Sequence, residues 1–135
     1  MRATAEFLSQ HGIRPSIQRT TVLHYLRGVK THPTVDEIYQ ALLPDNPSLS
    51  RTTVYNTLEL LSDNGLVLTL DFGEGFLRYD ADCSPHCHFI CDGCRKVFDI
   101  MDAPPECGSM LPRGFRLKGV QLKLFGTCAT CSKKA

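Results

Sequence analysis

The sequence predicts an α+β protein in which an N-terminal winged helix-turn-helix is followed by a small α/β domain. Two observations favour this architecture. The first 65 residues have the apolar spacing and capping residues of helices, and two strand-like runs follow them. Beyond Asp80 the composition changes to Cys, His, Gly and Pro, with short apolar runs typical of strands. We therefore expect one domain over residues 1–80 and another over residues 81–135, with a hinge at Asp80–Ser84.

Helices are expected wherever a capping residue precedes an amphipathic run. Thr34 and Glu37 have the spacing of a capping box, and Ser50 can cap the helix that follows the break at Pro44 to Pro47. That last helix should close at Asn64-Gly65 and turn Val54, Leu58 and Leu61 towards the core. The expected helices cover residues 3–11, 16–29, 34–43 and 51–64.

Strands are expected in both domains. Leu66–Phe72 and Phe76–Asp80 flank Gly73-Glu74-Gly75, which is typical of a hairpin. Helices followed by a hairpin are the order of a winged helix-turn-helix. In the second domain we expect short strands at His86–Cys91 and Val97–Met101. A longer one is expected at Phe115–Phe125, where a change of phase at Gly119 indicates a bulge.

Composition and charge limit the possible functions. A chain of 135 residues with 42% hydrophobic and 21% charged residues has ordinary globular composition. No apolar run approaches the ~20 residues of a membrane span, and the start does not resemble a signal peptide, so we expect a cytoplasmic protein without a membrane partner. Up to Gly75 the charge is −2 (six Lys/Arg, eight Asp/Glu). Nucleic-acid binding by this half would depend on a few well-placed arginines.

Two C-x-x-C pairs, Cys91/Cys94 and Cys128/Cys131, predict a structural zinc site. Each pair places two thiolates on one tight turn, and two such turns complete a tetrahedral shell of four sulfurs, as in a zinc ribbon. A single pair could instead be a redox couple, but two pairs in a cytosolic chain favour zinc. The site should fix the C-terminal tail to the middle of the domain.

A second metal site is predicted from histidines and carboxylates. His86 and His88 are two residues apart on an expected strand, so both rings project from one face. Three imidazoles and two carboxylates suit Fe(II), Mn(II) or Zn(II). Taken singly, each could be an ordinary surface residue, above all His32, which lies far from the others in sequence. The candidate ligands are His32, Asp80, His86, His88 and Asp99.

The sequence resembles the ferric uptake regulator family over nearly its whole length. The matching stretches are His32–Tyr39, Thr53–Asn56, Asn64–Val67, Arg78–Asp80, His86–Cys94 and Gly126–Cys131. The resemblance implies a homodimer whose second domain is the dimerisation domain and whose helix after Ser50 reads the major groove of an operator in double-stranded DNA. It also implies that the four cysteines hold Zn(II), and that the five histidines and aspartates form a regulatory site that locks the two domains together.

Two residues resemble the peroxide-responsive branch of this family. Asp99 stands where iron-sensing members usually have Glu, and Asn56 stands where they often have Arg. In that branch, Fe(II) at the regulatory site reacts with peroxide and a histidine ligand is oxidised, here His32 or His86. An iron- or zinc-level sensor of the same family is the alternative.

Other positions depart from the family pattern. Gly119-Val120 replaces a common His-His pair, and the family helix between the last strands is weak because Pro104, Pro105 and Gly108 disfavour it. Cys83, Cys87 and Cys107 are interpreted as small, partly buried hydrophobic residues. A soft ligand from Cys83, which would favour zinc sensing, is the alternative.

For DNA, we expect base contacts from the helix after Ser50 and phosphate contacts from arginines near the second helix. The candidates are Arg51, Thr52, Tyr55 and Asn56 for the first group and Arg14 and Arg19 for the second.

Two other classes of protein are considered. A zinc deaminase would pair H-x-E with P-C-x-x-C, and His86-Cys87-His88 has no Glu, so we expect no enzyme. A zinc-ribbon interaction module without sensing explains the cysteines and leaves His32, Asp80 and Asp99 unexplained. Replacing His32 by Ala separates the two, since only a sensor should lose metal-dependent binding.

Overall fold

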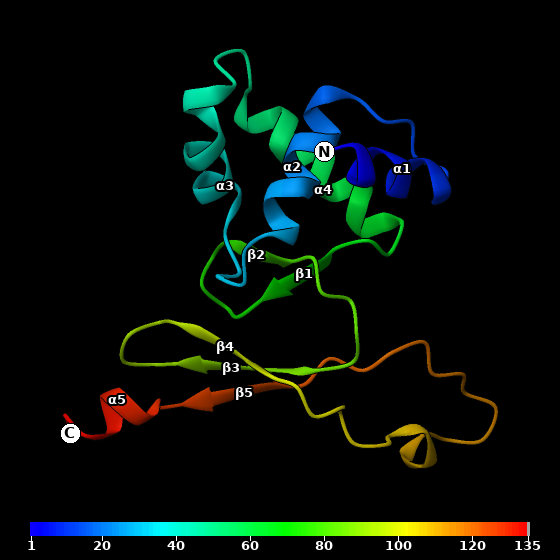
Figure 1. Cartoon of the computed structure of the whole chain (residues 1–135). Coiled ribbons are helices and arrows are strands. Elements are labelled where there is room, and N and C mark those ends of the chain that lie inside the picture. The colour runs from blue at the N-terminus through cyan, green and yellow to red at the C-terminus, as the bar shows by residue number, and fades with distance from the viewer. Residues whose placement is uncertain (135) are drawn as a thin grey trace. The chain divides into compact units, whose positions relative to one another are not determined.

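The computed structural model describes residues 1–134 and divides the chain into two units, Met1–Cys83 and Ser84–Ala135 (Figure 1). A two-stranded sheet belongs to the first unit and a three-stranded sheet to the second. No helix within residues 1–134 combines the length and the apolar character that crossing a membrane requires.

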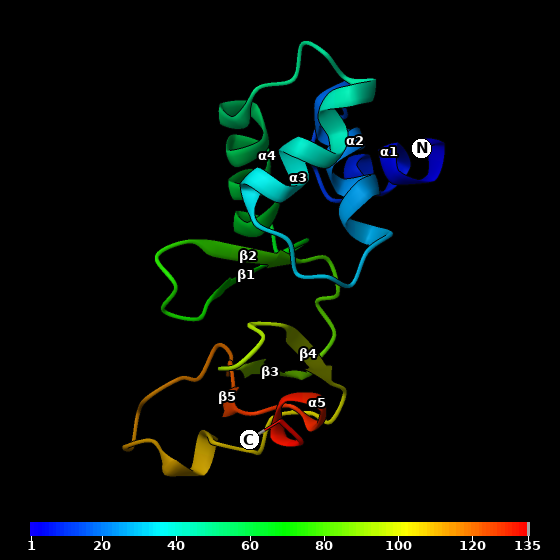
Figure 2. The same ribbon diagram turned by 90° about the vertical axis from the view of Figure 1, so that its left-hand side faces the viewer.

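The first unit contains four α-helices and a short 3-10 turn, η1 (Leu43–Asp45). The helices lie on one side of a β-hairpin (Figure 2). Their N-terminal caps explain where they begin: the Ser16 and Ser50 side chains accept from backbone N–H groups three residues on, and Thr34 and Glu37 form both halves of a capping box. The capping residues predicted at Thr34–Glu37 and at Ser50 are thus confirmed. The helices are α1 (Arg2–Gln10), α2 (Ile17–Arg27), α3 (Val35–Leu42) and α4 (Arg51–Asp63).

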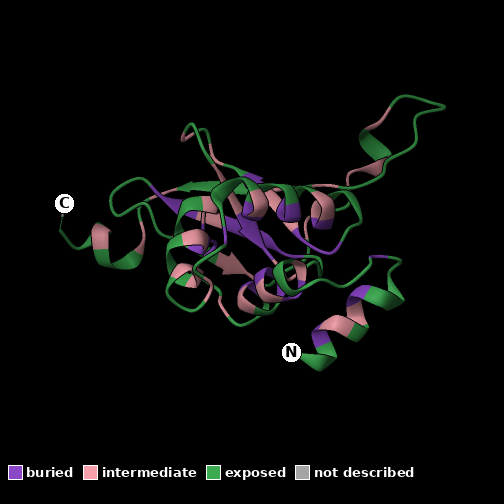
Figure 3. Cartoon of the chain, turned by 90° about the horizontal axis from the view of Figure 1, so that it is seen from above, coloured by how far each residue is buried: buried purple, intermediate pink, exposed green. Residues whose placement is uncertain are grey.

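The core of this unit consists of the inward faces of the helices, and Figure 3 shows these buried faces in purple. Val54, Leu58 and Leu61 of α4 are each 0% exposed, which confirms the predicted stripe. Tyr79 from the hairpin reaches the same cluster. Burial of apolar side chains at helical spacing is therefore what fixes α4 against the other helices.

The hairpin pairs β1 (Leu68–Asp71) with β2 (Leu77–Asp80) in antiparallel register, with Leu68 opposite Asp80. Gly73 and Gly75 have φ of +74° and +87°, the left-handed conformation that favours glycine. The predicted first strand began too early, because Leu66 lies in the C-terminal cap that follows α4. Its N–H donates to the Leu61 carbonyl, as in a Schellman cap.

The second unit is a three-stranded sheet in the order β4-β3-β5. Strands β3 (Cys87–Cys91) and β4 (Val97–Ile100) are antiparallel, and β5 (Lys123–Gly126) runs parallel to β3. Between β4 and β5 the described chain has only a 3-10 turn, η2 (Gly108–Met110), as the weak helix signal indicated. A short helix, α5 (Ala129–Ser132), follows β5.

The predicted strand Phe115–Phe125 is wrong over most of its length, and the predicted bulge at Gly119 falls outside any strand. Only Lys123–Gly126 is a strand, because the pairing with β3 covers just four residues. Phe115 and Leu117, which supplied the alternating pattern, are 65% and 47% exposed. Alternation marks a face only where a partner strand exists to define it.

Candidate metal centres

Four cysteines from two turns of the second unit converge. Cys91 ends β3 and Cys94 follows it, whereas Cys128 caps α5 and Cys131 lies within that helix. Their sulfur atoms all lie within 4.8 Å of one another, with Cys94 Sγ and Cys128 Sγ 3.9 Å apart. Tetrahedral zinc with Zn–S bonds of ~2.3 Å places its sulfurs roughly 3.8 Å apart, so this donor set fits zinc.

Backbone amides stabilise negative charge on these sulfurs. Cys91 Sγ accepts from the N–H groups of Cys128 (3.3 Å) and Cys94 (3.4 Å), and these bonds lower the pKa of the Cys91 thiol to about 6. Hydrogen bonds to the Cys91 and Cys128 sulfurs raise the pKa of the Cys131 thiol to about 12. Metal binding here therefore releases protons.

Gly93 allows the two turns to approach each other. A Cβ atom at this position would lie 3.0 Å from Cys131 Sγ and 3.2 Å from Cys131 Cβ. Any larger residue at Gly93 would crowd Cys131 and push the two turns apart by a few tenths of an ångström.

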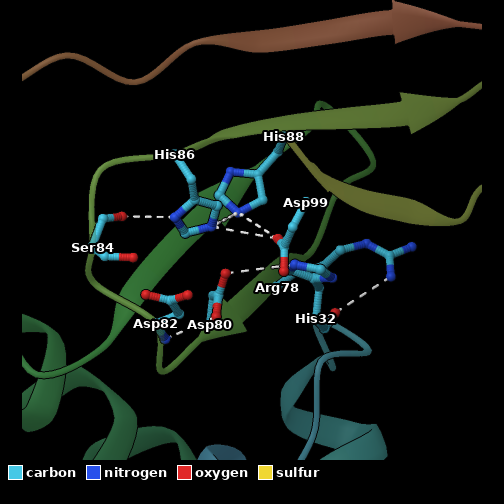
Figure 4. Close-up of polar contacts among 8 residues, drawn as sticks. All are labelled: His32, Arg78, Asp80, Asp82, Ser84, His86, His88 and Asp99. Atoms are coloured by element: carbon cyan, nitrogen blue, oxygen red, sulfur yellow. Dashed lines mark hydrogen bonds and ion pairs between the residues drawn. The ribbon is translucent and has the colours of Figure 1, made fainter. Parts of the chain in front are cut away.

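A second set of ligand atoms converges at the start of the same sheet. His86 precedes β3, His88 lies within it, and Asp99 of β4 is the register partner of His88. His86 Nε2 and His88 Nε2 lie 3.4 and 3.5 Å from Asp99 Oδ1, and 3.0 Å from each other (Figure 4). The expectation that both rings share a face is confirmed.

These distances fit a metal ion. Metal–nitrogen and metal–oxygen bonds of ~2.1 Å place neighbouring ligand atoms roughly 3 Å apart. His86 Nδ1 lies 2.7 Å from the Ser84 carbonyl, so a proton on Nδ1 leaves Nε2 as the ligand atom. The His86 and His88 rings are nearly buried, which limits competition from water.

His32 and Asp80 form a corresponding pair in the first unit. His32 Nε2 lies 3.5 Å from Asp80 Oδ2, and both residues are buried. The other oxygen, Asp80 Oδ1, accepts from the Asp82 N–H at 2.9 Å, which fixes the carboxylate at the end of β2. His32 precedes α3 and has φ +53°, a conformation that costs a non-glycine residue about 1–2 kcal/mol.

The five predicted regulatory residues are therefore divided between the two units: two lie together in the first and three in the second. Of the remaining cysteines, Cys87 is buried and donates to the Asp102 carbonyl, and Cys107 is half-buried. Cys83 is exposed, so its interpretation as a partly buried hydrophobic residue is wrong. Sequence reasoning also missed the ion pair between Glu74 and Arg78, although their i,i+4 spacing was visible.

The candidate DNA-contacting side chains of α4 lie on its exposed face. Arg51, Thr52, Tyr55 and Asn56 are all exposed. The Arg51 guanidinium lies over the Tyr39 ring and 2.7 Å from Asp36 Oδ1.

The two candidate phosphate-binding arginines lie near the beginning of α2. Arg19 donates to the Arg14 carbonyl at 2.9 Å. A hollow of about 430 Å³ lies between α2 and α4, and its lining includes Arg19 and Asn56. One candidate from each group thus borders the same hollow.

Residues 10–125 match the ferric uptake regulator family. The chain belongs to this family. The peroxide operon regulator of Bacillus subtilis (strain 168) is 36% identical in an alignment that covers 99% of the chain and 94% of that protein. The peroxide-responsive repressor PerR of Staphylococcus aureus (strain Mu50 / ATCC 700699) is 38% identical over 94% of the chain and 88% of that protein.

Solved structures of the family agree. The ferric uptake regulator of Pseudomonas aeruginosa with manganese superposes with a TM-score of 0.73 at 26% identity, over 93% of the chain and 98% of that structure. The resemblance drawn from the sequence is thus confirmed. The expectation that the protein is no enzyme is confirmed as well, because these relatives are regulators and repressors.

Proposed function

We propose that this protein is a metal-dependent, DNA-binding transcriptional repressor that senses peroxide. The convergence of His86, His88 and Asp99 is the observation that carries this proposal, because two buried imidazole nitrogens and a carboxylate oxygen lie at the spacing of ligands around one ion. The relatives that are 36% and 38% identical are named as a peroxide operon regulator and a peroxide-responsive repressor.

Zn(II) at Cys91, Cys94, Cys128 and Cys131 would have a structural role. A shell of four thiolates leaves no open position for chemistry. It would fix α5, at the C-terminal end of the described chain, to the end of β3.

The regulatory ion would be Fe(II) or Mn(II), with Zn(II) as a further possibility, held by His32, Asp80, His86, His88 and Asp99. His32 and Asp80 belong to the proposed DNA-binding domain (residues 1–80), of which Asp80 is the last residue. The other three belong to the proposed dimerisation domain (residues 81–135). An ion that binds both sets at once favours the arrangements in which they meet, and this shift of population would regulate DNA binding.

Peroxide sensing would depend on the identity of the ion. His32 and His86 are among the residues that would hold Fe(II), and the ion would supply the reducing chemistry for peroxide there. One oxygen of peroxide would be added to the ring of His32 or His86, and the other would leave as water. The oxidised ring would be a poorer ligand, so the affinity for metal would fall and the arrangement that binds DNA would be depopulated. An iron- or zinc-level sensor would use the same residues without this oxidation.

We propose further that the first unit is a winged helix-turn-helix of a homodimer on double-stranded DNA. α4 would enter the major groove with Arg51, Thr52, Tyr55 and Asn56, and Arg14 and Arg19 would contact phosphates. Replacing Asn56 should then alter base preference, whereas replacing Arg19 should weaken binding to all sequences and lower the salt slope by about one.

The decisive experiment is peptide mass spectrometry after anaerobic loading with Fe(II) and a short peroxide pulse, with a Mn(II)-loaded control. One added oxygen on His32 or His86, present only with Fe(II), is the expected result. If the site is shown to be occupied by Fe(II) and the histidines are still unmodified, the protein would be a sensor of iron or zinc levels and not of peroxide. A His32→Ala variant with unchanged metal-dependent DNA binding would instead favour an interaction module without sensing.

A further inference from the structure

His32 has a backbone conformation that its own residue type does not favour. Among residues 1–134, only His32 and Arg95 have a positive φ without being glycine. Arg95 is exposed and follows the turn at residues 92–94, whereas His32 is 2% exposed. A buried histidine with φ +53° stays in that conformation only where surrounding contacts hold it.

Those contacts come from β2 and from α3. The Pro33 carbonyl accepts from the Tyr79 N–H at 3.0 Å, and the Thr34 N–H donates to Glu37 Oε1 at 3.1 Å. The His32 carbonyl itself accepts from Arg78 Nη1 at 3.4 Å (Figure 4). Hydrogen bonds therefore fix the backbone of three consecutive residues. For His32 the donor is the side chain of Arg78.

Arg78 is fixed by a bidentate ion pair. Its Nε and Nη2 atoms donate to the two oxygens of Glu74 at 2.8 and 3.0 Å, which leaves Nη1 directed at His32. The two side chains are only 12% and 6% exposed. A guanidinium held by both carboxylate oxygens has a defined plane, so the direction of its remaining donor is defined too.

Side chains along β2 point alternately to its two faces, and this explains why one strand contacts both the imidazole and the backbone carbonyl of His32. Tyr79 is directed into the helical core, so Arg78 and Asp80 share the opposite face. Asp80 contacts the imidazole and Arg78 contacts the carbonyl of the same residue. Glu74 belongs to the loop between the two strands, so the hairpin loop is connected to His32 through a single side chain.

We propose that the Glu74–Arg78 pair positions His32 for the regulatory metal and couples that ligand to the hairpin loop. The inference rests on the proposed function, in which His32 is a ligand. Partners of this kind, which orient a ligand without touching the metal, affect metal affinity by about 10–100-fold when replaced. Because coupling is reciprocal, metal binding at His32 should also order residues 73–75.

The test uses the full chain with its zinc in place and Mn(II) as the probe. Arg78→Lys keeps the positive charge but removes the guanidinium that donates to both oxygens of Glu74. Glu74→Gln keeps the shape of the side chain but removes its negative charge. Each should weaken Mn(II) binding roughly 10–100-fold with zinc content unchanged. The double variant should lose little more than either single variant, since both remove one interaction. Arg27→Lys is the matched control: Arg27 lies over the Phe7 ring, so the variant leaves the Glu74–Arg78 pair intact and should bind Mn(II) like the wild type.

Hydrogen exchange separates positioning from a general structural role. In the wild type, Mn(II) should slow amide exchange in residues 73–75, and Glu74→Gln should abolish this slowing. If Arg78→Lys loses zinc or unfolds, the Mn(II) affinity and amide exchange of Glu74→Gln test the proposal by themselves. Mn(II) affinity and exchange like the wild type in both variants would overturn the inference, provided that His32→Ala still weakens binding. An unchanged affinity in His32→Ala would overturn the proposed function itself.

Discussion

The two candidate metal sites differ in how much of the molecule each requires. The four cysteines belong to one unit and lie on two turns that one sheet brings together. The histidines and aspartates are divided, with His32 and Asp80 in one unit and His86, His88 and Asp99 in the other. A site contained in one unit can be permanent, whereas a site that needs two units responds to how they are arranged. Under the proposed function, the same chain would combine a fixed metal with a switchable one.

Replacing Cys91 by Ser should have the largest effect. Cys91 is fully buried and its sulfur accepts from two backbone amides, so its loss disrupts the turns as well as the metal shell. Structural zinc contributes on the order of 10 kcal/mol to folding in small domains. We expect zinc to be lost and hydrogen-exchange protection of β3 and β5 to collapse, while α2 and α4 stay protected.

Cys107→Ser is the matched control for that experiment. Cys107 donates to the Pro105 carbonyl and lies outside the cluster, so zinc content should not change. Zinc bound as tightly by Cys91→Ser as by the wild type would contradict the assignment of the four-cysteine site.

Removing the regulatory ion should have a smaller effect. Mn(II) at 100 times its dissociation constant stabilises the folded protein by about 2.7 kcal/mol, because it binds the native state alone. We expect mild chelation to lower the unfolding temperature and to leave one zinc per chain. If zinc and Mn(II) are lost at the same chelator concentration, the cysteine site is no more permanent than the regulatory site, which contradicts the prediction.

The substitution Gly93→Ala should have a similar or smaller effect, confined to the cysteine site. Its methyl group would meet Cys131 Sγ at 3.0 Å, and overpacking of this kind costs about 1–3 kcal/mol. Zinc should therefore dissociate faster to a competing chelator, with Mn(II) affinity unchanged. Gly119→Ala, where no atom lies within 4 Å, serves as the control. Equal zinc retention in both variants would show that the turns have room to separate.

Local features of this fold could be predicted from sequence, because a few neighbouring residues determine them. Ser50 and the Thr34–Glu37 capping box start their helices as expected, and the stripe on α4 is buried. The strand expected at Phe115–Phe125 failed because strand formation depends on a partner elsewhere in the chain.

The candidate site divides in the same way. The cysteine turns and the His86/His88 pair were visible as short motifs. The contact between Arg78 and the His32 carbonyl, 46 residues apart, was not, since no periodicity links an arginine to a distant backbone carbonyl. The strain at His32 was hidden for the same reason: φ +53° is set by tertiary contacts rather than by residue type.

Mn(II) titration of the zinc-loaded chain tests most directly whether residues of both units bind a single ion, as we propose. The variants are His32→Ala, His88→Ala and the double variant, with His11→Ala as an exposed control. We predict one Mn(II) per chain in the wild type and in the control. Each single variant should lose most of the affinity, and the double variant should lose far less than the sum, because both residues act on one ion. Two independent Mn(II) sites, or losses that add fully, would contradict the account.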